Sequence, residues 1–383
     1  MAGDPALRSF FWQALLVLAV AGLVVWAGRN VAANLRASSI TYGFDFLGAP
    51  ANFDITGSLL PFRAGDTYAM ALLAGFGNTL AAAALAIVLA TALGFVVGVA
   101  RLSSNALLAG CAGAYVELLR NTPLLLQLLV WYNLALKPLP GPRQSIALPG
   151  GLLLNNRGLY LPWPADSPAW RALAVAVAAS VAAGLVALWR RRRRRLAGGL
   201  SGAAWLAAAA LPAAVGAVAV VTGAVSGGLP VSWPQLRGFN VSGGVTLLPE
   251  FVALTMGLAV YTSAFIAEIV RAGVQGVSRG QREAGRALGL TEWQILRLVV
   301  LPQALRIIIP PLTGQYLNLT KNSSLAVAIG YPDLVLVGAG PVLQNTGQAL
   351  EVISLIMLVY LSLSLLTAAL MNWWNARMAL VER

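Results

Sequence analysis

Long apolar runs separated by short polar segments dominate the sequence. A helix needs roughly 20 apolar residues to cross a bilayer, and runs near or above this length recur along the chain. This pattern predicts an all-α, polytopic membrane protein with about eight membrane-spanning helices. The expected spans are residues 10–28, 69–100, 107–136, 169–189, 199–222, 249–273, 303–331 and 349–371.

Three of these runs can be interpreted from their composition and flanks. The first follows a single arginine, Arg8, and has no small-residue cleavage site before the polar sequence begins. We therefore interpret this run as a retained membrane span rather than a removed signal peptide. The runs at 169–189 and 199–222 are almost entirely Ala, Val, Leu and Gly. Because they are apolar on every face, we expect a pair of peripheral helices in contact with lipid.

Composition agrees with the membrane pattern and restricts the chemistry. The chain is 58% hydrophobic and 10% charged, which excludes a soluble protein with a single core. It contains no histidine, and Cys111 is its only cysteine. The usual metal ligand and the usual general base at neutral pH are therefore absent. We expect neither enzymatic activity, nor a metal, nor a cofactor bound by this chain.

Lysine and arginine predict the orientation. If the N-terminus is cytoplasmic, sixteen of these residues fall on the inner side and eight on the outer side. The positive-inside rule favours this arrangement, with both termini cytoplasmic. Much of the bias comes from the six arginines at 190–195, which we interpret as a topology anchor at the inner leaflet. No basic, aromatic-rich domain surrounds them, so no nucleic-acid partner is expected.

The polar segments divide the chain into four parts. Residues 1–68 form an N-terminal span with an outer loop, and residues 69–136 form the first two helices of a core. Residues 137–248 hold outer loops, the expected helix pair and the arginine run. Residues 249–383 form the last three core helices. The outer loops at 29–68 and 137–168 are rich in Gly, Pro and Asn, which predicts connecting loops or docking surfaces without a sizeable core.

Polar residues inside the span at 107–136 point to a kink. Glu117 and Arg120 are three residues apart and share a helix face, and Pro123 removes a backbone hydrogen bond. An internal ion pair beside a kink explains these residues. Because a charge at membrane depth tends to face a cavity or a partner, direct contact with a solute explains them as well.

Two further spans carry polar residues. Tyr261, Ser263 and Glu268 interrupt the span at 249–273, and Glu268 precedes Arg271 by three residues. The span at 303–331 ends in a cluster that fits a polar cavity or gate; hydrogen bonding between helices is the alternative. This cluster comprises Asn318, Thr320, Lys321, Asn322, Ser323 and Ser324.

The polar segment between these spans predicts two helices joined by a sharp turn. Ser278 with Gln281, and Thr291 with Gln294, have the spacing of capping boxes. Gly289 suits the left-handed position that ends a helix. Arginines at 279, 282 and 286 define one basic face of the first helix, beside small and apolar contact residues at 284, 287 and 288. Small residues favour close packing into the groove of another protein over insertion into headgroups.

The same segment resembles the EAA loop of ABC importer permeases. Glu283, Ala284, Gly289, Leu301 and Pro302 stand at the intervals of that motif. Gly285 replaces its second alanine and Val299 its isoleucine, and both replacements are small changes in size. More widely, the chain resembles the polar amino-acid permeases, and among them the longer subunits of general L-amino acid importers. The segments that carry this likeness are "GFGNTL", "GVARLS", "YVELLRNTPLLLQLLVWY", "YTSAFIAEIVRAG", "LPQALRIIIPPL", "KNSSLA" and "NNRGLYLPWP".

The resemblance implies a fold, partners and a mechanism. The fold is a type I importer core of five helices, here extended by one N-terminal helix and an inserted pair. The EAA loop, 278–302, is the coupling helix that contacts a cytoplasmic ATPase. The implied partners are a homologous second permease, two ATPase subunits and a periplasmic amino-acid-binding protein. The coupling residues are Glu283, Ala284, Gly285, Arg286, Gly289, Leu301 and Pro302.

Two chemical expectations accompany the resemblance. The phosphate-binding string G-x-x-x-x-G-K-S/T is absent, so ATP and Mg²⁺ are expected in the partner subunit. An amino acid is a zwitterion, and its path needs partners for both charges. Arg120 or Lys321 could meet the carboxylate, and Glu117 or Glu268 the ammonium. The remaining candidates along the path are Tyr261, Ser263, Asn318, Asn322 and Ser323. The alternative function is a secondary transporter or channel that needs no ATP.

Overall fold

The computed structural model describes residues 5–37, 43–167, 170, 171, 174, 178 and 230–378. The chain divides into two compact units. The first, the helical unit, combines Met1–Leu129 with Leu254–Arg383, and the second, the β unit, is Val130–Ala253. Nearly all of the helix pair expected at 169–222, and the whole arginine run at 190–195, lie outside the described residues.

The described residues are mostly helical. Five of their helices are long and apolar enough to cross a membrane: Ser9–Asn30, Tyr68–Ala100, Pro249–Gln275, Glu292–Ile329 and Ala349–Asn375. These correspond to five of the predicted spans. The long helices are α1 (Pro5–Ala37), α2 (Tyr68–Ala100), α3 (Ala106–Asn121), α7 (Pro249–Gln275), α10 (Leu301–Asn322) and α13 (Ala349–Met378).

The span predicted at 107–136 is not one continuous helix. It consists of α3, α4 (Leu124–Val130) and the π-helical turn η2 (Trp131–Leu136). The break falls between Asn121 and Leu124, where Thr122 is extended. Pro123 disfavours a helical conformation at the residue before it and leaves the preceding turn without a hydrogen bond. A kink was predicted at Pro123; the irregularity is at that position, but it is a break that separates two helices rather than a bend in one.

Short helices surround the long ones. Residues 334–346, for which no helix was expected, form an interrupted apolar helix whose parts meet at Gly338 and Pro341. The short elements of the helical unit are η1 (Asp45–Gly48), α8 (Arg279–Ala287), α9 (Glu292–Gln294), η4 (Ile295–Val300), η5 (Ser323–Ile329), α11 (Leu334–Val337), η6 (Gly338–Val342) and α12 (Leu343–Thr346).

Buried apolar and polar side chains together fix α11 against α2. A core cluster contains Tyr68 and Ala71 from α2 and Leu334 and Val337 from α11. The loop before α11 lacks helical partners for its backbone groups, and α2 supplies them. Thr79 Oγ1 accepts from the Leu334 N–H at 3.0 Å. Such buried polar groups require partners, so this contact holds one specific packing arrangement.

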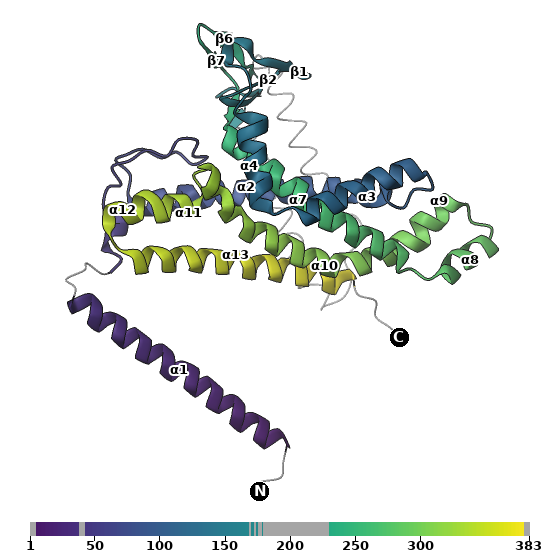
Figure 1. The fold of residues 1–383 in the computed structure, drawn as a ribbon, viewed down its shortest axis with the longest axis horizontal. Helices are drawn as coiled ribbons and strands as arrows, with labels where there is room; N and C mark the ends of the chain where they lie inside the picture. Colours follow the sequence, from purple (N-terminus) through teal and green to yellow (C-terminus); the bar gives the residue numbers. More distant parts are fainter. Residues whose placement is uncertain are drawn as a thin grey trace, which may run out of the picture. The chain divides into compact units, whose positions relative to one another are not determined.

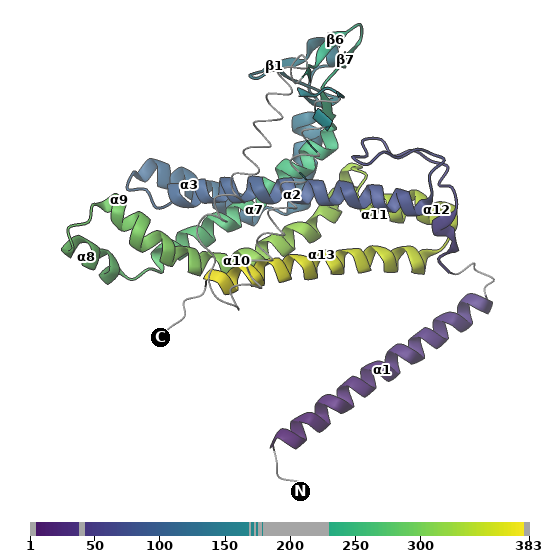
Figure 2. The same ribbon diagram turned by 180° about the vertical axis from the view of Figure 1, so that it is seen from behind.

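The helical unit has two distinct ends. α10 and α13 run side by side, and α2 packs against α11 (Figures 1 and 2). In both views α8 and α9 lie at the opposite end of this unit from α11 and α12. The polar segment that interrupts the apolar pattern is therefore a projection at one end of the helical unit.

The β unit corrects the all-α expectation. Its antiparallel strands form a four-stranded sheet in the order β1-β2-β3-β8 and two pairs, β4-β5 and β6-β7. Tyr160 lies opposite Leu153 on one side and Thr246 on the other. The elements are η3 (Pro142–Gln144), β1 (Ile146–Leu148), β2 (Leu152–Asn155), β3 (Gly158–Leu161), β4 (Trp163–Pro164), β5 (Val231–Ser232), β6 (Gln235–Arg237), β7 (Asn240–Ser242) and β8 (Val245–Leu247). These turn-rich segments are thus folded hairpins rather than connecting loops.

Candidate functional site

The turn between α8 and α9 is built by local backbone hydrogen bonds. Gly289 has φ +75°, a left-handed conformation that glycine adopts without a Cβ penalty. The Leu290 N–H donates to the Gly285 carbonyl at 3.1 Å, and the Gly289 N–H donates to the Arg286 carbonyl at 2.9 Å. This is the Schellman ending of a helix. The predicted glycine turn is confirmed.

The two predicted capping boxes have different outcomes. Thr291 and Gln294 form a complete capping box at the start of α9. The prediction of a capping box at Ser278 is wrong, because the Ser278 side chain makes no cap hydrogen bond. Gln281, its expected partner, instead accepts a hydrogen bond from Gln303 Nε2 at 3.2 Å. A contact with α10 has therefore replaced the local one.

α8 packs against η4 through one small residue and exposes most of its other side chains, although Arg282 of the predicted basic face is partly buried. Gly285 is buried, and a Cβ placed there would come within 2.8 Å of Ile295. Arg279, Glu283, Ala284 and Ala287 are exposed. The predicted basic and small-residue face is therefore open for contact with another protein.

Electrostatic and apolar contacts complete this surface. The Arg286 Nε donates to Glu292 at 2.7 Å across the turn, and this hydrogen bond raises the pKa of Arg286. Leu288 is 80% exposed and Trp293 67% exposed. Leu288 was predicted as an apolar contact of this helix, whereas Trp293 was not among the predicted residues. Exposed apolar groups beside charges are typical of docking surfaces. We call Arg279, Glu283, Ala284, Leu288 and Trp293 the coupling surface.

The last two residues of the motif serve the following helix. Leu301 and Pro302 are the first residues of α10, directly after the π-helical turn η4, within one apolar helix that runs from Glu292 to Ile329. Because proline has no N–H to donate, its place beside the π-helical turn fits the irregular hydrogen bonding there. Leu301 is 41% exposed. The motif thus contains a contact surface on α8 and the residues at which η4 continues into α10.

Glu117 and Arg120 do not pair. Among the described residues no ion pair joins them, and both are exposed. The Arg120 guanidinium instead lies 5.2 Å from the centroid of the Phe265 ring. Tyr261 contacts the same ring in a tilted arrangement, with centroids 5.0 Å apart. α3 and α7 thereby bring Arg120 and Tyr261, two of the predicted solute-path residues, together.

Two predicted path residues are engaged in packing contacts. Ser263 is fully buried, and its hydroxyl is 2.7 Å from the Tyr115 hydroxyl of α3. Ser323 is also fully buried and donates to the Thr320 carbonyl at 2.7 Å. Buried hydroxyls with these partners join or end helices. Neither side chain is accessible to a solute in this conformation.

Glu268 has two arginine partners. Arg271 pairs with it as the spacing suggested, and Arg101, from the end of α2, pairs with its other oxygen. Arg101 was not among the predicted site residues, because 167 positions separate it from Glu268. With both oxygens occupied, Glu268 is a poor candidate for binding a solute ammonium group.

One face of α10 is open along much of its length. Ile307, Pro310, Gly314, Asn318 and Lys321 are all exposed, and their spacing of three or four residues places them on a single face. Asn322 is partly exposed. Within the described part of the chain, Lys321 makes no ion pair. A charged residue in an apolar span requires a partner or a polar path.

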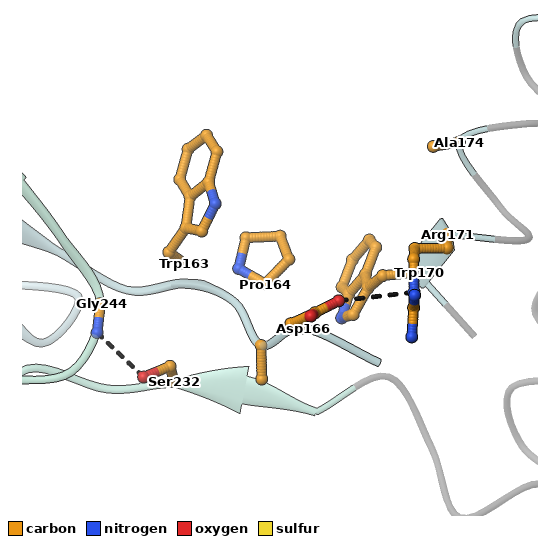
Figure 3. Close-up of a pocket in the computed structure, with 9 residues that line it drawn as sticks. Trp163, Pro164, Asp166, Trp170, Arg171, Ala174, Ser232 and Gly244 are labelled. Carbon is orange, nitrogen blue, oxygen red and sulfur yellow. Dashed lines mark hydrogen bonds and ion pairs between the residues drawn. The ribbon is translucent and has the colours of Figure 1, made fainter. Parts of the chain in front are cut away.

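The β unit contains a separate open cavity of about 700 Å³. Figure 3 shows Asp166 and Arg171 directed toward each other beside the ring of Trp170, with Trp163 earlier in the same segment, on β4. Asp166 and Arg171 pair at 3.4 Å, but their side chains are 86% and 70% exposed. An ion pair so exposed is screened by water. The cavity is therefore a weaker solute site than the α10 face.

The family comparison accounts for this combination of apolar helices and an exposed α8. The family described as "Binding-protein-dependent transport system inner membrane component" matches residues 90–380, which include both α8 and the open face of α10. The chain belongs to this family. The expected resemblance to ABC importer permeases is thereby confirmed.

Three relatives match over nearly the whole chain. The general L-amino acid transport system permease protein AapQ of Rhizobium johnstonii is 48% identical, over 99% of this chain and 94% of that protein. The putative amino-acid ABC transporter permease protein YhdX of Escherichia coli is 46% identical, over 99% and 96%. The glutamate/glutamine/aspartate/asparagine transport system permease protein BztB of Rhodobacter capsulatus is 38% identical, over 99% and 96%.

Membership in the binding-protein-dependent family settles the class of activity. The chain is a permease subunit of an ABC importer and lies in the inner membrane. It is a transport component rather than an enzyme, and the family implies an ATPase and a binding protein as partners. A secondary transporter or channel, the alternative function, is not supported.

Proposed function

We propose that this permease serves an importer of amino acids and that α8 transmits the action of a separate ATPase. The coupling role is proposed from the position and exposure of the coupling surface. It projects from one end of the helical unit, immediately after a long apolar helix, and exposes charged, small and large apolar side chains together. The names of the three full-length relatives support amino acids as cargo.

The proposal extends to the architecture. Residues 69–136 and 249–383 would form the five-helix core of a type I importer, with an extra helix in 1–68 and a helix pair within 137–248. The coupling surface would face the cytoplasm together with both termini, as the arginine distribution suggests. Two ATPase subunits would hold ATP and Mg²⁺ and would contact the coupling surface.

We assign the open face of α10 to a homologous second permease. In a bilayer, polar and small residues on one helix face favour association with another helix. Gly314 would allow close approach, and Asn318 and Lys321 would line the path formed between the two subunits. Arg120 and Glu117 on α3 are the other accessible charged residues proposed for this path.

Replacing Lys321 with methionine is expected to raise the KM for uptake of a labelled amino acid about tenfold, because a hydrogen bond to a charged carboxylate is lost. The stimulation of ATPase by the binding protein should persist. Lys321→Arg, which keeps the charge, is the matched control and should behave nearly as wild type. Equal KM values for Lys321→Met and wild type would remove Lys321 from the path.

The β unit is the proposed receptor for the binding protein. Trp163 is 55% exposed, and aromatic residues are enriched in protein interfaces.

Trp163→Ala should raise the binding-protein concentration that gives half-maximal ATPase stimulation about tenfold, as expected for loss of an interface anchor. Trp26→Ala, in the exposed surface of α1, is the control. The same shift in both variants would contradict this assignment.

The proposed function is tested by reconstitution. Vesicles containing this chain, the partner permease, the ATPase and the binding protein should take up labelled amino acids from a panel only when ATP is supplied to the ATPase side. A panel of acidic, amide, basic and apolar amino acids would define the cargo. Uptake that continues without the ATPase would overturn the ATP-driven mechanism. ATP-driven uptake of other solutes alone would overturn the cargo assignment.

A further inference from the structure

α2 and α7 approach closely along a short stretch of small residues. A Cβ added to Gly94 would lie 2.6 Å from Ile266, and one added to Gly98 would lie 2.7 Å from Val270. Close backbone approach maximises van der Waals contact between membrane helices. The two helices are thus already in tight contact before their polar ends are reached.

One turn beyond Gly98, an ion-pair cluster joins the same two helices. Arg101 Nη1 donates to Glu268 Oε2, and Arg271 Nη2 donates to Oε1. Arg271 also donates through Nε to both oxygens, at 3.2 and 3.3 Å. The side chains of Arg101, Glu268 and Arg271 are 18%, 27% and 31% exposed. Partial burial reduces screening, so these contacts hold more firmly than surface pairs.

The position of the cluster relates it to the coupling surface. α7 ends at Gln275 and α8 begins at Arg279, so a three-residue segment separates them. Arg271 Nη1 also donates to Gln275 at 2.7 Å. The cluster therefore fixes the last turns of α7 to the end of α2 just before the chain enters α8.

We propose that Glu268 is a positioning residue that joins α2 and α7 at their α8 ends, so that displacement of α8 moves both helices as one body. This inference rests on the proposed coupling role of α8. Arg101 supplies the connection to α2, and Arg271 orients the carboxylate toward it. Without Glu268, two guanidinium groups would face each other without an anion between them, and the helix ends would separate.

The test uses the complete transporter in vesicles. Glu268→Gln keeps the shape of the side chain and removes its charge. It should lower the ratio of binding-protein-stimulated to unstimulated ATPase about fivefold or more, the usual range of a coupling free energy. Arg101→Gln should give a similar loss, and the double variant should be no worse than either single variant, because the two residues act as a pair.

The matched control is Glu351→Gln on α13. The Glu351 carboxylate accepts a hydrogen bond from the Gly43 N–H at 2.8 Å, and a glutamine oxygen can accept it as well. This variant should retain the wild-type ATPase ratio. If Glu268 bound the solute instead, Glu268→Gln would raise the KM for uptake and leave the ATPase ratio intact, which would overturn the proposal.

Two further outcomes separate this inference from the proposed function. Wild-type ATPase ratios and uptake in Glu268→Gln, with transport lost in Gly289→Asp on the α8 turn, would overturn the positioning role alone. Normal transport by a well-expressed Gly289→Asp variant would remove the coupling role of α8 and overturn both.

Discussion

Replacing Gly289 with aspartate is expected to lower amino-acid uptake by more than about tenfold, within the range of coupling free energies between sites, while the protein remains in the membrane. Gly289 ends α8 and adjoins the coupling surface. A new carboxylate there would add a negative charge next to the coupling surface that we propose to contact the ATPase. Uptake per unit of permease, quantified by immunoblot, measures the effect.

The fold itself should tolerate this substitution. Apart from the adjoining residues, no atom of the described part of the chain lies within 4 Å of a Cβ built on Gly289. The left-handed backbone costs roughly 1 kcal/mol for a residue with a side chain, which is small against the stability of a whole protein. A large loss of uptake would therefore come from the contact with the partner rather than from unfolding.

Asparagine separates charge from backbone conformation. Gly289→Asn has the shape of the aspartate variant, tolerates the left-handed region and carries no charge. It should retain most of the uptake. If Gly289→Asn and Gly289→Asp lost uptake equally, the backbone or the bulk at this turn would be responsible, and the electrostatic explanation would be wrong.

Features determined by neighbours in sequence were predictable. The turn at Gly289 and the cap at Thr291 depend on hydrogen bonds within a few residues, so the residue types suffice to identify them. The interruption at Pro123 follows in the same way from the missing N–H. The capping box predicted at Ser278 does not form despite the correct spacing, because the Gln281 side chain accepts a hydrogen bond from Gln303 of α10 instead.

Features that depend on distant contacts were not predictable. The spacing of Glu117 and Arg120 shows only that they share a helix face, and the Phe265 ring from α7 changed the position of the guanidinium. The partner of Glu268 on α2 has no signal in the local sequence. Both outcomes depend on which helices pack together, and the apolar pattern does not specify that arrangement.

The β unit was missed for a different reason. Its strands contain two to four residues each, too short for an alternating pattern to emerge against the strong apolar background. The outer strand of the main sheet, β8, comes from a segment far along the chain from β3. The glycine and asparagine residues of the turns could be recognised in the sequence, but the pairing of the strands between them could not be predicted from it.

Replacing Gly94 with valine is expected to destabilise the helical unit by roughly 1 to 3 kcal/mol, the usual cost of forcing extra atoms into a packed interior. The new Cβ would lie 2.6 Å from Cβ and Cγ2 of Ile266 and 3.0 Å from the Ser263 carbonyl oxygen. The Ser263 carbonyl oxygen belongs to the backbone, so it cannot move away unless α7 itself shifts. The helices must therefore separate, and the contacts between Arg101 and Glu268 would be strained as a consequence.

Gly110 on α3 provides the matched control. It lies in a helix like Gly94, but beyond its own helix backbone a Cβ there would have no neighbour within 4 Å among the residues that the structure describes. Both valine variants change helix propensity by the same small amount, so the difference between them isolates the contact of α2 with α7. Heating the detergent-solubilised protein and measuring the monodisperse fraction by size-exclusion chromatography gives the comparison. Gly94→Val should lose this fraction at a clearly lower temperature than Gly110→Val. Equal thermal stability would mean that α2 and α7 can separate without cost, and the close approach would then have no structural role.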